Sequence, residues 1–395
     1  MAPGPLSRRS FLSGAMAVAA GGLAVACGRG SDAEAPTSAA GAASPSTNAV
    51  DFFGEHQAGI VTPPPRSATM VALDATAATV AAVTGGFRAL SDEVRALTDV
   101  HDDVGAVNAI VAVGPSLFDE RYGLAARRPS ELVAMPRFAN DELDPTRTHG
   151  DVLVTVSGDD DTTTAAAIQR VVGAVDGVLA PRWTVSGFNE RSADEAHARN
   201  LMGFLDGTSN PDITAEAPMR QFVWVRPRDD EPEWAAGGSY MAVRVIRMLL
   251  DDWEGTGVAD QEAIIGRRKA SGAPLGGGTA ADVPDYVDDH DGAVTPLTAH
   301  IRLANPRDTS IEYDSILRRG FSYDRGRDAA GRLDAGLAFV SFQRSLDKGF
   351  LAIQARLAGE PLEQFTRPQG GGFFFALPGV RDEDDWLGRT LLHAA

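Results

Sequence analysis

The spacing of apolar and polar residues predicts a series of short strands and helices from about residue 50 onward. Residues 69–74 and 151–156 are rich in apolar and branched side chains, as strands are. Residues 77–97 and 165–175 have the spacing of helices. Further elements are expected at residues 221–225, 239–250, 337–343, 349–357 and 372–377. Without a sustained βαβ rhythm or a phosphate-binding glycine fingerprint, this pattern favours an α+β fold of two halves, each an antiparallel sheet covered by helices.

The first 50 residues differ in composition from the rest and predict an export signal followed by a linker. Ser7-Arg8-Arg9-Ser10-Phe11-Leu12 precedes a short apolar run, which together indicate a twin-arginine signal over residues 1–27. The run is too short and glycine-rich to favour a membrane anchor. Lipidation of Cys27 stays open, although Ala24 stands where lipoprotein signals usually have a larger aliphatic residue. Residues 28–50 are rich in Ala, Ser and Pro and predict a linker.

Composition then narrows the function. The chain has 395 residues, 44% of them hydrophobic, which is enough for a sizeable core. Its 54 acidic and 36 basic residues give a net charge of -18, so a nucleic-acid partner is not expected. Cys27 is the only cysteine and lies in the predicted signal, so neither a disulfide nor a thiolate-bound metal is expected in the folded body. A metal or cofactor must therefore be held by histidine or carboxylate.

The seven histidines show no paired spacing of the kind that binds zinc: they are His56, His101, His149, His197, His290, His300 and His393. A lone histidine is usually structural. His300 differs because Arg302 and Arg307 follow it closely. Haem requires one neutral imidazole for its iron and cations for its propionates, and this segment offers both.

A second candidate is the glycine-flanked carboxylate in Gly203-Phe204-Leu205-Asp206-Gly207-Thr208-Ser209-Asn210-Pro211. It has two interpretations. Asp206 and the Asn-Pro step can form an ordinary tight turn. Alternatively, the glycines let the backbone approach a flat ligand closely, which would place Asp206 over a macrocycle.

Together these segments resemble the dye-decolourising peroxidases. Residues 203–207 match the GxxDG hallmark of that family, and other similar segments run along nearly the whole chain beyond the predicted linker. They lie at residues 53–60, 237–240, 300–307, 316–323, 337–343 and 370–379. The twin-arginine signal makes the chain most similar to the exported subgroup that includes deferrochelatase/peroxidases.

The resemblance implies two ferredoxin-like halves, at residues 51–215 and 216–395, with one haem b held mainly by the second. It implies His300 as the iron ligand, Asp206 as the distal acid and Arg318 as the distal arginine, 18 positions after His300. Contacts to the haem are implied for Gly207, Thr208, Ser209, Asn305, Pro306, Arg307 and Arg318. Arg307 would pair with a propionate.

One position departs from the family pattern. A carboxylate commonly accepts the Nδ1 hydrogen of the proximal histidine and makes that ligand more anionic. The position aligned with it here is Gln364, with Glu363 adjacent. We therefore expect either that Glu363 takes the role or that the proximal ligand is less anionic than in relatives.

The implied function is a peroxidase that uses hydrogen peroxide to oxidise dyes, phenol-like or other reducing substrates through a ferryl intermediate. A deferrochelatase-like role in iron uptake and a non-catalytic haem or iron carrier are the alternatives. The deferrochelatase-like role would have an iron permease and a lipoprotein as partners. Whether the chain forms a homo-oligomer stays open. The expected location is periplasmic, extracellular or at the cell envelope.

Two further features have open interpretations. Electrons can enter through aromatic residues, although such residues usually pack in the core; the candidates are Trp183, Trp224, Trp234, Trp253, Trp386, Tyr240, Tyr313 and Tyr323. The acidic stretch 282–292, which contains His290, is typical of a solvated loop. Its alternative is an oxygen-rich iron or manganese site near the haem entrance.

Overall fold

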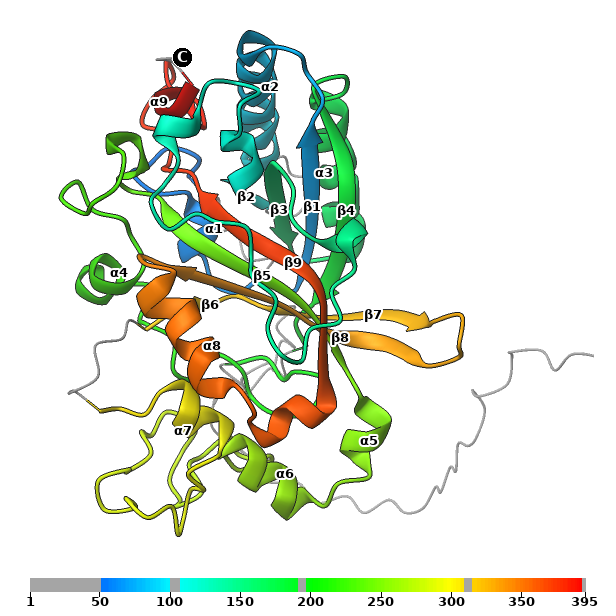
Figure 1. The fold of residues 1–395 in the computed structure, drawn as a ribbon, viewed down its shortest axis with the longest axis vertical. Coiled ribbons are helices and arrows are strands. Elements are labelled where there is room, and N and C mark those ends of the chain that lie inside the picture. The colour runs from blue at the N-terminus through cyan, green and yellow to red at the C-terminus, as the bar shows by residue number, and fades with distance from the viewer. Residues whose placement is uncertain (1–50, 100–106, 191–196, 309–314, 393–395) are drawn as a thin grey trace, which may run out of the picture. The chain divides into compact units, whose positions relative to one another are not determined.

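The first half of the sheet is a ferredoxin-like βαββαβ unit, visible in the computed structural model (Figure 1). The structure describes residues 51–99, 107–190, 197–308 and 315–392, all within one compact unit of the chain. The elements of the unit are β1 (Ser67–Ala75), α2 (Val80–Thr98), β2 (Asn108–Val113), β3 (Val152–Gly158), α3 (Asp161–Ala174) and β4 (Leu179–Phe188). The strands lie in the order β2-β3-β1-β4, and all neighbours are antiparallel.

The second half repeats this strand order with longer connections. Its strands are β5 (Ser239–Met248), β7 (Phe321–Arg327), β8 (Leu333–Gln343) and β9 (Thr366–Ala376), arranged antiparallel as β7-β8-β5-β9. The short β6 (Leu317–Arg318) pairs with β8. Helices α5 (Leu250–Glu254), α6 (Val258–Ile265) and α7 (His300–Ala304) lie between β5 and β7, and α8 (Ala352–Leu357) lies between β8 and β9.

Shorter elements complete the connections. Three further helices are α1 (Ala58–Val61), α4 (Glu216–Phe222) and α9 (Arg389–Leu392). The 3-10 turns are η1 (Pro115–Phe118), η2 (Ala125–Arg127), η3 (Pro145–Arg147), η4 (Glu233–Ala235) and η6 (Pro361–Phe365), and η5 (Asp347–Leu351) is a π-helix that leads into α8. No helix in the described ranges is both long and apolar enough to cross a bilayer.

The two sheets join into a closed ring of eight strands. One seam pairs β2 with β9 at Ala112–Ala376 and Val113–Phe375, and the other pairs β4 with β7 at Phe188–Ser322. Because β5 also pairs with β8, the ring has no open edge among these eight strands. Alternate side chains, including Met70, Leu153 and Phe374, form a continuous apolar cluster from both halves on one face.

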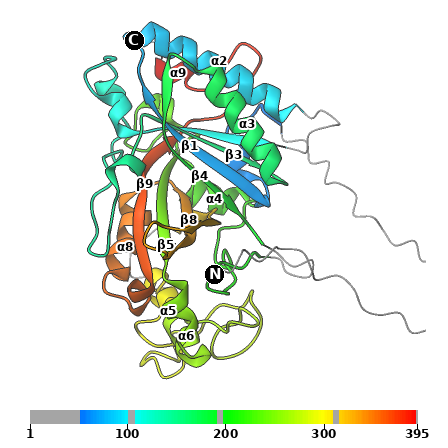
Figure 2. The ribbon, with the colours of Figure 1, turned by 90° about the vertical axis from the view of Figure 1, so that its right-hand side faces the viewer.

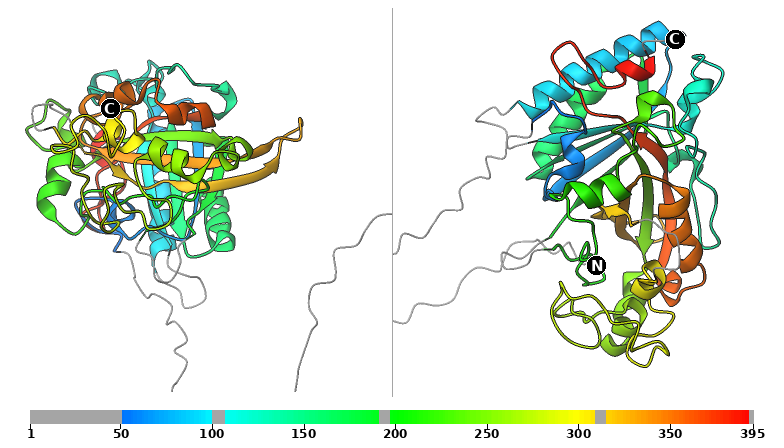
Figure 3. Two further views of the ribbon diagram at one scale, coloured as in Figure 1. Left: turned by 90° about the horizontal axis from the view of Figure 1, so that it is seen from below. Right: turned by 90° about the vertical axis from the view of Figure 1, so that its left-hand side faces the viewer.

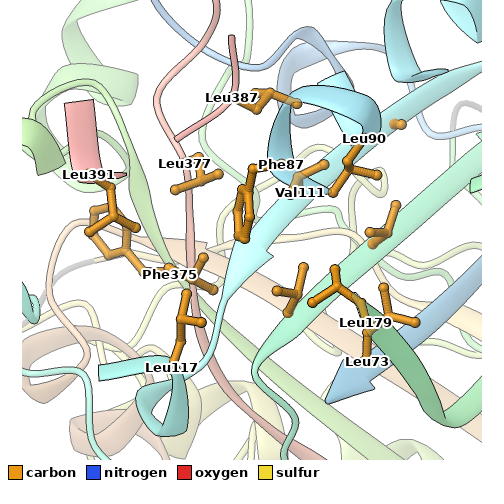
Figure 4. Packing of buried hydrophobic residues seen from close by; sticks show 14 of the residues in the cluster. Leu73, Phe87, Leu90, Val111, Leu117, Leu179, Phe375, Leu377, Leu387 and Leu391 are labelled. Atoms are coloured by element: carbon orange, nitrogen blue, oxygen red, sulfur yellow. The ribbon is translucent and has the colours of Figure 1, made fainter. Parts of the chain in front are cut away.

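The opposite face of the first sheet is covered by α2 and α3, which lie side by side (Figures 2 and 3). Buried residues of α2 recur at the three- and four-residue spacing of one helical face: Val83, Phe87, Leu90, Val94 and Leu97. Thr79 caps this helix, since its side chain accepts a hydrogen bond from the Ala82 amide at 3.2 Å. Figure 4 shows Phe87 and Leu90 packed against strand residues such as Val111 and Leu73.

The fold prediction is confirmed, with errors at particular segments. Residues 69–74, 77–97, 151–156 and 165–175 fall almost entirely within β1, α2, β3 and α3. Residues 221–225 are wrong as a separate element, because they contain only the end of α4 and then irregular backbone. Strands β2, β4 and β7 were not predicted. The predicted half boundary at residues 215 and 216 stays a prediction.

Several features of the sequence lie outside the described residues. They are the export signal at residues 1–27 with Cys27, the linker at residues 28–50, and His101, Tyr313 and His393.

Candidate functional site

The second sheet does not pack directly against all of its helices, because a cavity of about 260 Å³ lies between them. Arg244, Ile246 and Met248 line it from alternate positions of β5, and Leu337 and Phe339 line it from β8. Helices α7 and α8 form the other side and contribute His300, Ile301, Ala304, Ile353, Gln354 and Leu357. The wall is mostly apolar, with a few polar groups, as in sites that hold small molecules.

His300 begins α7 and faces this cavity with its ring held by a carboxylate. The Nδ1 atom lies 2.8 Å and 3.0 Å from the two carboxylate oxygens of Glu360. The Glu360 side chain is only 7% exposed, against 27% for His300. This partner assigns the hydrogen to Nδ1, so Nε2 is left as a lone-pair donor on the opposite side of the ring.

The expectation for this partner was wrong. Neither Glu363 nor Gln364 bonds the imidazole in the described structure; Glu360, just before η6, does so. Glu363 lies one turn of η6 later, and its backbone amide donates to the Glu360 carbonyl oxygen at 3.1 Å. The segment Glu360-Pro361-Leu362-Glu363-Gln364 contains two carboxylates. Residue type alone therefore does not show which of them bonds the imidazole. The acceptor of the imidazole hydrogen is therefore a carboxylate, the residue type that the resemblance implies.

Asp206 and Arg318 meet at the same cavity from distant parts of the chain. The Arg318 Nη2 lies 3.5 Å from Asp206 Oδ1, with side-chain exposures of 27% and 34%. Arg318 lies in β6, and Asp206 lies in the loop before α4. Gly207 has φ of 87°, a conformation that disfavours any side chain, so a glycine is required directly after Asp206. The second interpretation of this loop is favoured, because Asp206 lines the cavity.

Asn210 is a functional candidate that the sequence analysis did not identify beyond its turn. Its Nδ2 donates to the Arg318 carbonyl oxygen at 2.8 Å, and its Oδ1 accepts from the Arg318 amide at 3.1 Å. The same Oδ1 lies 3.5 Å from Arg318 Nε. The loop that carries Asp206 therefore also fixes the strand that carries Arg318. An Asn-Pro step indicates a turn but says nothing of this long-range partner.

Only some of the other predicted haem-contact residues line the cavity. Thr208, Ser209 and Asn305 line it, whereas Gly207 lines an adjoining chamber. Arg307 lines a neighbouring recess of about 250 Å³ together with Arg267. Pro306 does not appear in the lining of any of these spaces.

Arg307 and Arg267 make this rim of the cavity cationic. Arg307 has a left-handed φ of 55°, and its Nη2 lies 3.4 Å from Ser209 Oγ. Its Nε is buried and has no hydrogen-bond partner within the described part of the chain. Arg267 is buried, and its guanidinium donates to the carbonyl oxygens of Gly272 and Ala280. Burial and the neighbouring Arg307 lower the pKa of Arg267. The rim is therefore prepared for an anion.

A buried ion pair holds the far wall. Arg244 pairs with Asp141 of the first half, and their side chains are 2% and 0% exposed. The guanidinium also lies over the Phe138 ring, 4.8 Å from its centroid. Since β5 carries Arg244, this pair attaches a loop of the first half to the edge of the cavity.

The acidic stretch 282–292 is built as an ordered loop. Asp289 accepts hydrogen bonds from the amides of Val294 and Thr295 and from Arg302 Nη1, at 2.8, 2.7 and 3.1 Å. Among the residues that the structure describes, no three His, Cys, Asp or Glu side chains are grouped so as to hold a metal. Most residues of the stretch are exposed, which favours the solvated-loop interpretation.

The proposed aromatic entry points are core residues wherever the structure describes them. Trp183, Trp224, Trp234, Trp253, Trp386, Tyr240 and Tyr323 are each at most 8% exposed. Their rings pack into the apolar clusters, which favours the packing interpretation.

Comparisons with known proteins cover both halves of the chain. The family models described as Dyp-type peroxidase, N-terminal and C-terminal, match residues 57–189 and 197–381. The chain is 42% identical to proteins named deferrochelatase from Escherichia coli and Shigella sonnei, over 98% of this chain and 97% of each relative.

Solved structures show the same likeness. A DyP-type peroxidase from Streptomyces coelicolor has a TM-score of 0.80 and 37% identity, covering 89% of this chain and all of the other. Ferric DtpA from Streptomyces lividans has a TM-score of 0.79 and 37% identity, covering 87% of this chain and 96% of the other.

Proposed function

The chain belongs to the Dyp-type peroxidase family and is a haem peroxidase, and from this premise we propose which residues hold the haem and cleave peroxide. His300 is the iron ligand, oriented by Glu360. Asp206 is the proton carrier and Arg318 the cation of the peroxide-binding side. Thr208, Ser209, Asn305 and Arg307 contact the haem, together with Arg318.

The residues around the cavity fit a haem group. Its mostly apolar wall suits a macrocycle, and the imidazole of His300 has Nε2 available because Glu360 occupies Nδ1. The buried Arg307 Nε, without a partner among the described residues, suits a propionate. When bound, haem supplies the iron that accepts oxidising equivalents from hydrogen peroxide.

The protein's own contribution is proton transfer and charge. Asp206 accepts a proton from one peroxide oxygen and returns it to the other, which must leave as water. The guanidinium of Arg318 stabilises the negative charge that develops as the oxygen–oxygen bond breaks. Asn210 positions Arg318, and Glu360 keeps His300 in one tautomer while making it a stronger electron donor. The observation that carries the proposal is that His300 and the Asp206–Arg318 pair line one cavity.

A second candidate function is release of iron from haem. It is supported by the 42% identity with proteins named deferrochelatase. In that role an iron permease and an iron-binding lipoprotein would be partners. The Asp206–Arg318 pair argues against a pure haem carrier, because storage does not require proton transfer.

The ligand assignment predicts the behaviour of two histidine variants. His300→Ala is expected to lose tightly bound haem and the Soret band after purification, because no other side chain of the site replaces the imidazole. His290→Ala, in the exposed acidic loop, is the matched control and should keep both. Circular dichroism checks that each variant is folded. A folded His300→Ala protein with a full Soret band would contradict the assignment.

The role of Arg318 predicts a rate. Arg318→Leu should slow the first reaction with hydrogen peroxide about a hundredfold, equivalent to roughly 3 kcal/mol of lost charge stabilisation. Stopped-flow absorbance of the haem-loaded protein measures this step. Arg332→Leu, 72% exposed on the β7–β8 hairpin, should react like the parent. Equal rates for Arg318→Leu and the parent would remove Arg318 from the mechanism.

The iron-release candidate predicts a product. Ferrous haem incubated anaerobically with the protein and a ferrous chelator should yield metal-free porphyrin, detected by its fluorescence, because two protons replace the Fe²⁺ in an intact macrocycle. If no porphyrin forms while peroxide turnover is normal, peroxidase activity stays as the one proposed function.

We also propose that the chain is exported by the twin-arginine route and works in the periplasm, outside the cell or at the envelope. Ser7-Arg8-Arg9-Ser10 and the apolar run after it support this. Replacing Arg8 and Arg9 with lysine should leave the protein in the cytoplasm, as cell fractionation would show. Normal export of that variant would argue for another route.

A further inference from the structure

A second chamber, of about 670 Å³, adjoins the haem cavity. The two spaces share a wall made of the same side chains: Asn200, Asp206, Thr208, Arg318 and Leu337 line both. A molecule in the chamber would therefore lie one side chain away from the cavity without entering it.

Arg319 contributes a buried charge to this chamber. It is 7% exposed, and its guanidinium donates to the Thr62 carbonyl oxygen and lies 3.4 Å from Thr62 Oγ1. No carboxylate within the described ranges lies at ion-pair distance from it. Burial lowers the pKa of Arg319 to about 10, so the group still carries its charge at neutral pH. Burying a guanidinium without a carboxylate partner costs free energy, and a bound anion would lower that cost.

Arg66 adds a second positive charge in the same chamber. Its side chain is exposed, and it too has no carboxylate at ion-pair distance among the described residues. The charges of Asp206 and Arg318 largely cancel, since they pair with each other. Asp212 also lines the chamber and adds one negative charge, and Arg199 adds a further positive one. The excess is positive, in a chain of net charge -18.

Hydrogen peroxide does not explain these charges. It is neutral at working pH, so a cationic chamber gives it no electrostatic advantage, whereas an anion is concentrated there. The remaining wall includes apolar surface from Pro64, Pro65, Ile213 and Leu317. Cations combined with apolar surface suit a small molecule with a carboxylate on an aromatic ring.

We propose that this chamber is the binding site for a small phenolic acid that serves as reducing substrate, with its carboxylate held by Arg66 and Arg319. The inference rests on the proposed function for the position of the shared wall. Two such donors each lose one electron and one proton from the phenol. These two electrons and two protons convert one hydrogen peroxide to two waters.

Binding is tested separately from turnover, on the haem-loaded protein. Isothermal titration calorimetry at pH 6 compares 4-hydroxybenzoate with 4-hydroxybenzamide, which has the same shape without the charge. A carboxylic acid with a pKa of about 4 is ionised at this pH. The acid should bind at least about tenfold more tightly than the amide, and added salt should weaken only the acid.

Variants locate the charge that is responsible. Arg66→Gln, at an exposed position, should weaken the acid about threefold to fivefold and leave the amide unchanged. Arg319→Met should weaken it about tenfold. Arg170→Gln on α3, 51% exposed, is the control and should change neither. In steady-state assays Arg66→Gln should raise KM for the acid while kcat stays constant.

The outcomes separate the two proposals. Equal affinity of the parent for acid and amide, or unchanged acid binding in both Arg66→Gln and a folded Arg319→Met, overturns the chamber assignment. Normal peroxide reactivity with a neutral donor in the same samples would leave the roles of Asp206 and Arg318 intact. If acid binding shifts the Soret band by direct contact with the iron, and does so equally in all variants, the acid occupies the haem cavity instead.

Discussion

Two short seams hold the strands in a ring, and every other feature is arranged around that closure. At one seam β2 and β9 share only Ala112–Ala376 and Val113–Phe375, and at the other β4 and β7 share only Phe188–Ser322. Within each half, neighbouring strands pair along most of their length. Few backbone bonds join the halves, and both large apolar clusters contain residues from each half, so burial of apolar side chains contributes to holding the halves together.

One face of each sheet lies inside the ring, so the other face must be covered by helices. The two halves differ in how their helices cover it. In the first half, α2 and α3 pack against the strands and fill the space with side chains such as Phe87 and Leu90. In the second half, the helices between β5 and β7 are short, and α7 and α8 stand off from the sheet around the cavity. In the proposed assignment, haem occupies the place that a hydrophobic core has in the first half.

The sequence was most informative where the signal was local. The spacing of α2 and the apolar, branched residues of β1 and β3 predict those elements directly, and the glycine after Asp206 marks a backbone conformation that the structure has. Residue type also singled out His300, because two arginines follow it. The ten-residue β4 was not predicted, because Pro181 and Gly187 are unfavourable in a strand.

What the sequence did not predict depends on distant pairing. Glu360 could not be chosen over Glu363, because both are acidic and only the turn of η6 decides which faces the imidazole. Asn210 was assigned to a turn, while its function lies 108 residues away at Arg318. The chamber beside Asp206 brings together Arg66 and Arg319, which are far apart in the sequence. Such partners become visible only when the chain is folded.

The Glu360–His300 contact also bears on the order in which parts of the second half fold. The imidazole comes from the connection between β5 and β7, and its acceptor comes from the connection between β8 and β9, 60 residues later. A nascent chain that has reached β7 has the ligand but not the group that fixes its tautomer. Long-range contacts of this kind form late, because the intervening chain must be ordered first. In the proposed assignment, the tautomer of the iron ligand is therefore fixed only once the connection between β8 and β9 has folded, so haem capture would report on that step.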